Sequence, residues 1–121
     1  MTTAEITQLI EETLAALSER MSGNEANPLV AEKLRGVITT DRRSVVQALK
    51  TYLAFRVAPE QRQPEDAVSE ARIWMALDVA KRLSLIELRP EIQSLVIDVR
   101  NRKVFLPVHE ASVAKYLQHL A

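Results

Sequence analysis

The sequence contains no cysteine, which excludes disulfide bonds, thiolate metal sites and thiol nucleophiles. Glycine occurs only at Gly23 and Gly36, whereas a sheet-rich fold with many tight turns needs more glycine. This scarcity also excludes glycine-rich phosphate-binding loops. Aromatic residues make up only 4% of the 121 residues, so a core must come mainly from Leu, Ile, Val and Ala. The composition therefore favours a helical fold.

Net charge is also lacking, because sixteen basic residues balance sixteen acidic ones. A dedicated nucleic-acid-binding protein usually has a basic excess, since neutralisation of phosphates supplies most of its affinity. The charges are nonetheless uneven: residues 1–34 hold six acids and two bases, whereas residues 35–56 hold one acid and five bases. Such an asymmetry could dock a charged partner, although uneven charge is more often only a solvated surface.

Long hydrophobic runs are missing as well, and none approaches the roughly 20 residues that span a bilayer. The N-terminal segment has no basic leader, and acidic residues interrupt its apolar stretches, so it does not resemble a signal peptide. We therefore expect a cytoplasmic protein with no membrane partner. The length fits one domain, and we expect residues 1–121 to form a single helical domain.

Apolar residues recur at three- and four-residue spacing along most of the chain, which is the pattern of amphipathic helices. A capping box of Thr2 and Glu5 begins the first of them. Asn27-Pro28 is a typical helix start, since Asn caps and Pro suits the first helical position. The longest helix has a broad apolar stripe that includes Val68, and we expect this stripe to be buried. The pattern predicts about six helices, at 2–21, 28–37, 42–56, 64–85, 90–100 and 109–120.

The stretch from Leu88 to Pro107 permits two interpretations. As a helix that starts at Pro90, it places Ile92, Leu95, Val96 and Val99 on one face. As a hairpin, residues 96–99 and 103–106 alternate around a turn at 100–102, and Val, Ile and Phe favour strands. The turn lacks the Asn-Gly or Asp-Gly that short hairpins prefer. We therefore expect an all-α fold, with an α+β fold that contains a 96–106 hairpin as the alternative.

An Ala/Leu-rich stretch at 71–80 is followed by a Pro-bearing turn at 88–92 and by a stretch at 95–100 that ends in Asp98-Val99-Arg100. This arrangement is similar to a HEAT-type helical repeat, and the resemblance covers at most residues 42–121. The starts of the expected helices repeat at about 48 and about 43 residues, close to the period of such arrays. The resemblance implies a short HEAT-like α-solenoid, with an irregular helical bundle as the alternative. It also implies protein–protein scaffolding, and a structural bridge by Asp98 and Arg100 between neighbouring repeats.

Patterns of catalysis and metal binding are not evident. His109 and His119 are ten residues apart, so they fall on different turns and faces of a helix. Ser112 lies near His109 at helical spacing, but no Gly-x-Ser-x-Gly elbow accompanies it. We therefore expect a protein that is not an enzyme, with no cofactor and no metal site.

Protein binding is the function that these features favour. We expect a protein–protein interaction module, as an adaptor or as an immunity or inhibitor partner of another protein. The acidic first helix would face a basic partner surface. Tyr52 and Trp74 are the natural large apolar anchors, although a Trp within an apolar stripe is more often part of the core. The candidate protein-binding residues are Glu5, Glu11, Glu12 and Glu19.

A helix-turn-helix DNA-binding regulator that uses residues 30–50 is the alternative function. This segment holds the basic block, with an Ala in the first helix and a Gly in the turn. The connection from Gly36 to Asp41 is longer than the usual turn of 3–4 residues, and the overall charge is neutral. The candidate DNA-binding residues are Arg42, Arg43, Ser44, Gln47 and Lys50.

Overall fold

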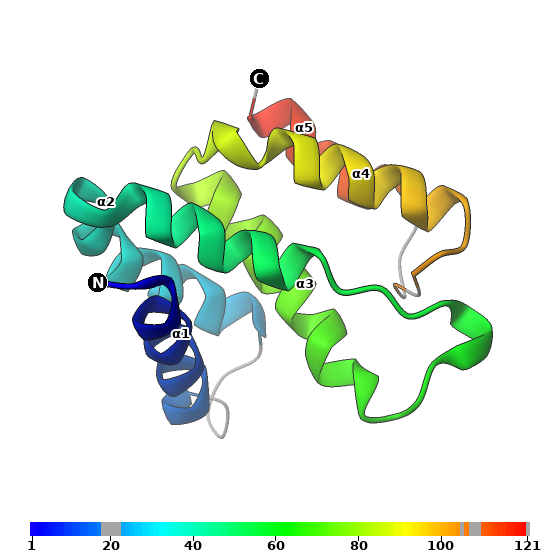
Figure 1. Ribbon diagram of the computed structural model, residues 1–121, viewed down its shortest axis with the longest axis horizontal. Helices are drawn as coiled ribbons and strands as arrows, with labels where there is room; N and C mark the ends of the chain where they lie inside the picture. Colours follow the sequence, from blue (N-terminus) through cyan, green and yellow to red (C-terminus); the bar gives the residue numbers. More distant parts are fainter. Residues whose placement is uncertain (18–22, 105, 107–109, 121) are drawn as a thin grey trace.

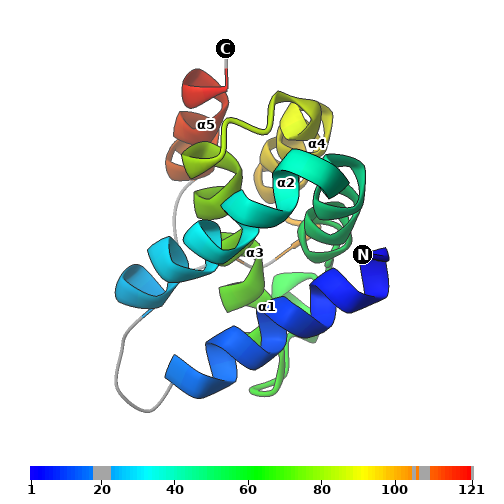
Figure 2. The ribbon, with the colours of Figure 1, turned by 90° about the vertical axis from the view of Figure 1, so that its left-hand side faces the viewer.

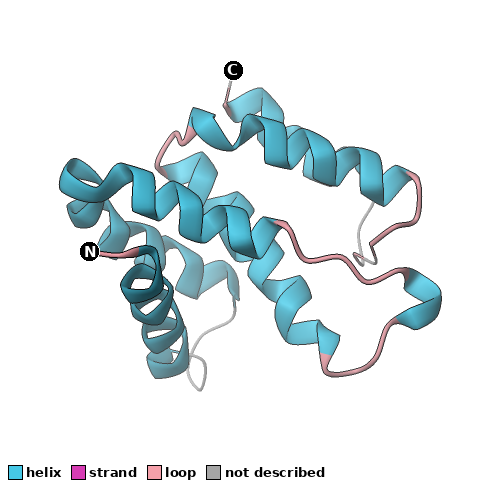
Figure 3. Cartoon of the chain, in the orientation of Figure 1, coloured by secondary structure: helices cyan, strands magenta, loops and turns pink. Residues whose placement is uncertain are grey.

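The computed structural model describes residues 1–17, 23–104, 106 and 110–120. Within these residues the chain contains five α-helices, two short 3-10 helices and no strand (Figures 1 and 3). This confirms the all-α fold. Residues 96–100 belong to a helix, so the alternative with a 96–106 hairpin is wrong. The elements are α1 (Thr3–Leu17), α2 (Gly23–Leu53), η1 (Pro59–Gln61), α3 (Asp66–Arg82), η2 (Ile86–Leu88), α4 (Arg89–Arg100) and α5 (Glu110–His119).

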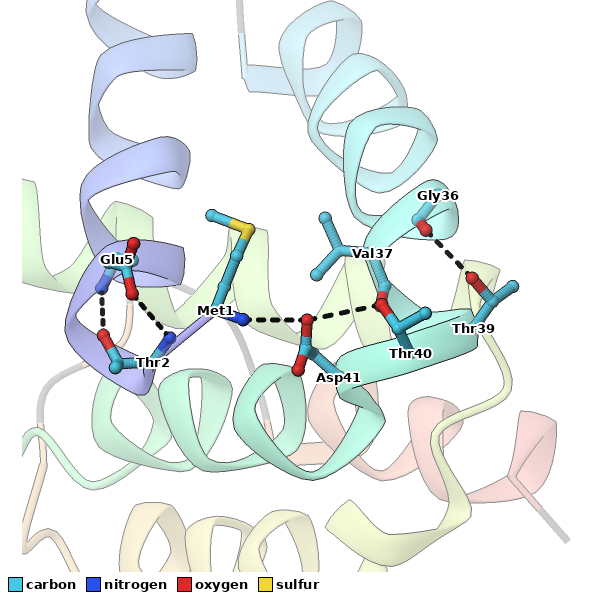
Figure 4. Close-up of polar contacts among 8 residues, drawn as sticks. All are labelled: Met1, Thr2, Glu5, Gly36, Val37, Thr39, Thr40 and Asp41. Atoms are coloured by element: carbon cyan, nitrogen blue, oxygen red, sulfur yellow. Dashed lines mark hydrogen bonds and ion pairs between the residues drawn. The ribbon is translucent and has the colours of Figure 1, made fainter.

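The predicted capping box is present at the start of α1. The hydroxyl oxygen of Thr2 accepts the backbone N–H of Glu5 at 3.1 Å, and the Glu5 carboxylate accepts the backbone N–H of Thr2 at 2.9 Å (Figure 4). These two bonds satisfy amides that have no partner within the helix. Ile6 and Ile10 follow on the buried face, as the apolar spacing predicts, whereas Met21 lies outside the described residues.

The longest helix, α2, consists of two segments that meet at Asp41, whose backbone torsions (φ −129°, ψ 39°) are not helical. Just before the kink, the Thr40 hydroxyl donates to the carbonyl of Val37 at 3.2 Å, a bond that competes with the regular helical ladder. The Asp41 carboxylate lies 2.9 Å from the ammonium of Met1, which brings the start of α1 to the kink (Figure 4). With α2 divided at Asp41, the described helical segments agree with the predicted number of about six.

The predicted start of the second helix at Asn27-Pro28 is wrong, because α2 begins at Gly23 and Pro28 lies inside it. Ala26 and Asn27 are 4% and 8% exposed, so the residues before the proline are packed into the interior. Burial of Ala26 and Asn27 overrides the local preference of Asn-Pro for a helix start.

The predicted end of the third helix at Arg56 is also wrong, because α2 ends at Leu53. The Arg56 guanidinium donates to the carbonyls of Leu53 at 2.6 Å and Phe55 at 2.8 Å, and thus supplies partners that the helix end lacks. It also binds Asp98 of α4 at 2.9 Å. Asp98 of α4 is therefore tied to the segment that follows α2, while the HEAT-like resemblance and its solenoid arrangement stay predictions.

The core is centred on the packing of α3 along α2. α1 packs against α2, and α4 and α5 form a pair that contacts α2 and α3. α1 and α5 lie at opposite ends of the molecule (Figure 2). Among the described helices, none is long and apolar enough to cross a membrane. The α3 residues that are at most 1% exposed are Ile73, Met75, Ala76, Leu77, Val79 and Ala80.

Candidate functional site

Three polar side chains from three helices meet beside α1. Arg72 of α3 donates to both carboxylate oxygens of Glu11 of α1, at 2.8 and 2.9 Å. The hydroxyl of Tyr52, near the end of α2, donates to Glu11 Oε2 at 2.5 Å. A two-point pairing of arginine with a carboxylate fixes the orientation of both groups. The cluster therefore holds α1 in a defined position relative to α2 and α3.

The contacts of the cluster change the acidity of two of its members. The pKa of the Glu11 carboxyl lies below its usual range, chiefly because Arg72 donates hydrogen bonds to the charged form. The pKa of the Tyr52 phenol is raised strongly, first by burial and then by its hydrogen bond to the Glu11 carboxylate. Glu11 is therefore a weak base and Tyr52 stays protonated at neutral pH. Neither group is suited to take a proton from a substrate.

The cluster forms part of the wall of a groove of about 440 Å³, within the size range of ligand pockets. The groove lies between α1, the C-terminal end of α2 and the N-terminal half of α3, and we call it the α1–α3 groove. Several of its walls are apolar, because Ala54, Phe55 and Val68 contribute to the lining. The full lining is Glu11, Thr51, Tyr52, Ala54, Phe55, Val68, Ser69 and Arg72.

Val68 is 59% exposed, so the prediction that it belongs to the buried stripe is wrong. It lies in the first turn of α3, which extends past the end of α2 (Figure 1). The buried stripe of α3 begins only where the neighbouring helices cover it, at Glu70 and Ile73. An apolar side chain is thus left at the open edge of the groove.

Of the four acidic residues predicted as a protein-binding face, Glu5 and Glu12 are exposed and Glu11 is half-buried. Glu5 takes part in the capping box, and Glu11 binds Arg72. Glu12 is exposed and accepts a hydrogen bond from Gln8 at 2.9 Å. Glu19 lies outside the described residues. The carboxylates of Glu5 and Glu12 each accept one hydrogen bond, whereas that of Glu11 accepts three, and the role of the acidic residues in binding stays a prediction.

Two of the five residues predicted to contact DNA are bound within the molecule. Arg42 donates to both carboxylate oxygens of Glu87 in η2, at 2.6 and 2.9 Å. Lys50 lies 3.5 Å from the carboxylate of Glu91 in α4. These cations neutralise carboxylates of η2 and α4, and a DNA phosphate would have to displace those carboxylates to bind them.

The other three predicted DNA contacts are Arg43 and Gln47, which are exposed, and Ser44, which is half-buried. α2 bends sharply at Asp41, so the segment that ends at Thr40 and the segment that begins at Arg42 lie at a large angle to each other (Figure 1). A helix-turn-helix motif requires a turn that sets its two helices at a large angle. DNA binding stays a prediction that Arg43 and Gln47 could still support.

In comparisons with known proteins, no family model, curated protein or solved structure matches this chain.

The sequence analysis identified Tyr52 as a large side chain suited to a partner, and Tyr52 lines the groove. It missed Arg72 and the exposure of Val68. A signal for Arg72 was present, because a charged residue between Ala71 and Ile73, inside an apolar stripe, indicates a paired charge.

Replacing Glu11 with glutamine is expected to lower the free energy of unfolding by about 1 kcal/mol at neutral pH, since the lost ion pair is partly exposed. The pKa of Glu11 is lowered in the folded state, so its contribution is present above the unfolded-state pKa of about 4.3 and is lost as pH falls through the folded-state value. Urea unfolding at neutral and at acidic pH measures the difference. The matched control is Glu12→Gln, because Glu12 forms no ion pair with the residues that the structure describes. A loss that is equal at both pH values would contradict the assignment.

Proposed function

We propose that the chain is a cytoplasmic, non-catalytic protein-binding module that acts as an adaptor or an inhibitor of another protein. In this proposal the α1–α3 groove holds an apolar side chain of the partner. The observation that carries the proposal is Val68, a large apolar side chain that is 59% exposed at the edge of a groove also lined by Phe55 and Tyr52. Exposed apolar side chains at a concave site are typical of interaction surfaces.

The polar groups of the groove support binding rather than catalysis. Arg72 is permanently charged and already bound to Glu11, whose own oxygens accept three hydrogen bonds. A catalytic base needs a free lone pair and a pKa near neutrality. The pKa of Glu11 is instead lowered from its usual acidic value, further from neutrality. The cluster is instead a rigid polar wall, and such a wall orients a partner without losing side-chain entropy on binding.

The charge of α1 indicates what should flank the apolar side chain of the partner. Residues 3–17 contain three carboxylates, Glu5, Glu11 and Glu12, and no basic residue. Arg72 offsets only the charge of Glu11. We therefore expect a partner segment in which an apolar residue is accompanied by Lys or Arg, since opposite charges speed association and fix register.

Replacing Val68 with glutamate tests the groove. Val68 is exposed, so the variant should fold, but a carboxylate at the groove edge should prevent entry of an apolar side chain. The matched control is Ile97→Glu on α4, because Ile97 is also apolar and is 45% exposed but does not line the groove. We expect a partner captured from nuclease-treated native lysate to bind the parent chain and Ile97→Glu but not Val68→Glu.

Three outcomes would contradict the proposal. Capture that Val68→Glu does not weaken would place the binding surface elsewhere. Concentration-dependent dimerisation of the purified chain that Val68→Glu abolishes would make a second copy of this chain the occupant. Salt-sensitive retention on duplex DNA that is lost in Arg43→Gln would instead support the DNA-binding alternative.

The acidic charge of α1 can be tested separately once a partner has been captured. Replacing Glu12 with glutamine should slow association with that partner by a few-fold at low salt and leave dissociation nearly unchanged.

A further inference from the structure

A second hollow, separate from the α1–α3 groove, lies between α3 and α5. It measures about 290 Å³. Ser112, Lys115, Tyr116 and His119 follow one another on α5 at three-, one- and three-residue steps, so they share one face of the helix. Lys81, in the last turn of α3, completes the lining, which is Lys81, Ser112, Lys115, Tyr116 and His119.

The three cationic or basic side chains of this hollow, Lys81, Lys115 and His119, are all exposed, and among the described residues none has a carboxylate within 4.0 Å. The nearby acid Asp78 is bound to Arg82 at 3.0 Å. Elsewhere in the described chain most arginines are paired with an acid.

Basic residues in the last turn of a helix offset its dipole, and this accounts for Lys81 and His119. It does not account for Lys115, which lies one turn before the end of α5. The hollow therefore combines lysines from two helices, and the position of Lys115 is not explained by the helix dipole.

Tyr116 connects this hollow to a neighbouring one of about 310 Å³, because its side chain lines both. The second hollow is lined by Trp74 as well, and the rings of Trp74 and Tyr116 lie 6.3 Å apart at an interplanar angle of 47°. Asn27, Asp78 and Arg82 complete the lining of the second hollow, so two aromatic rings among polar side chains adjoin the positively charged hollow.

We propose that the hollow between α3 and α5 binds the phosphate group of a small phosphate monoester. Lys81 and Lys115 supply charged donors, the Ser112 hydroxyl supplies a neutral donor, and the organic part of the ligand lies toward Tyr116 and Trp74. A tetrahedral phosphate presents oxygens in several directions and can accept from donors on two helices at once, whereas a planar carboxylate has only two oxygens. Lysine serves as a point-charge donor to phosphate in proteins. The inference does not depend on the α1–α3 groove.

Titration of the purified chain with three probes tests the inference: inorganic phosphate, adenosine 5′-monophosphate, and adenosine without phosphate. Trp74 is the only tryptophan, so its fluorescence reports on the aromatic wall, while amide shifts in NMR spectra report on α5. We expect both phosphate compounds to shift the amides of residues 112–119, with the monoester bound more tightly than inorganic phosphate. Adenosine alone should bind more weakly than the monoester.

Two variants give the matched comparison. Lys115→Gln should weaken binding of the monoester roughly ten-fold, the usual effect of losing one charged hydrogen bond. Lys33→Gln removes an exposed lysine of α2 that lies outside the hollow, and it should leave the affinity unchanged. Lys115 is itself exposed, so its replacement should not impair folding.

The inference is overturned by any of three results. The first is no amide shift at about 10 mM inorganic phosphate or monoester, a concentration that would fill even a millimolar site. Equal shifts with sodium chloride at the same ionic strength would show only general screening. Equal weakening by Lys115→Gln and Lys33→Gln would show that overall charge, rather than the hollow, attracts the anion.

Discussion

Truncation of Leu77 to alanine is expected to lower the free energy of unfolding by about 3 kcal/mol, within the roughly 2–5 kcal/mol typical of buried leucines. Leu77 is 0% exposed and lies in α3, the helix that contacts both α2 and α5. Because helices surround this position, the neighbouring side chains cannot fill the cavity without drawing packed helices together. Urea unfolding followed by circular dichroism measures the loss, and the slope with denaturant should stay unchanged if the transition remains two-state.

The matched control for Leu77 is Ile97→Ala on α4. Ile97 is also a large aliphatic residue of a helix, but it is 45% exposed, so its truncation should cost less than about 1 kcal/mol. Similar losses for the two variants would contradict the assignment of Leu77 to the core. Val68→Ala, in the same helix as Leu77, should behave like Ile97→Ala because Val68 is exposed.

Helical periodicity predicted the fold class because each helix buries one face. Ile6 and Ile10 of α1, and Ile92 and Leu95 of α4, are buried at the positions that three- and four-residue spacing indicates. The Val, Ile and Phe residues of the 96–106 stretch favour strands locally. The chain nevertheless forms α4, where Leu95 and Val96 pack into the core, so burial decided between the two interpretations.

Helix ends were predicted less well, because they depend on contacts between residues far apart in the sequence. The end of α2 is set in part by Arg56, which bonds to the last turn and to Asp98, 42 residues away. The start of α2 at Gly23 depends on burial of Ala26. Neither of these contacts can be recognised from the residues next to the start or the end of α2.

The candidate site combines one residue that the sequence indicated with others that it did not. Tyr52 was recognisable as a large side chain suited to a partner. The pairing of Glu11 with Arg72 joins residues 61 apart, and no spacing rule reaches across that distance. Val68 belongs to the predicted apolar stripe, but periodicity does not show how far α3 extends past its neighbours. The predicted acidic face (Glu5, Glu11, Glu12 and Glu19) therefore shares only Glu11 with the lining of the α1–α3 groove.

Replacing Arg62 with alanine is expected to lower the free energy of unfolding by more than the loss of an exposed ion pair does, since it leaves the buried carboxylate of Glu70 without this partner. Glu70 of α3 is only 4% exposed, and Arg62 donates to both of its carboxylate oxygens, at 2.8 and 3.0 Å. Arg62 directly follows η1, so this pair fastens the connection between α2 and α3 to the side of α3. Thermal and urea unfolding of the parent and the variant measure the loss.

The double variant Arg62→Met with Glu70→Met tests how much of the lost stability comes from the missing ion pair and how much from leaving the Glu70 carboxylate buried and unpaired. If desolvation of Glu70 dominates, the double variant should recover most of the stability that Arg62→Ala loses, because no buried charge remains. The matched control is Arg35→Ala, whose partner Glu32 is 70% exposed, and an exposed pair of this kind contributes less than about 1 kcal/mol. A loss for Arg62→Ala no larger than that for Arg35→Ala would mean that Glu70 is readily solvated when unpaired. The connection between α2 and α3, which supplies Ala54 and Phe55 to the α1–α3 groove, would then be held by its apolar contacts instead.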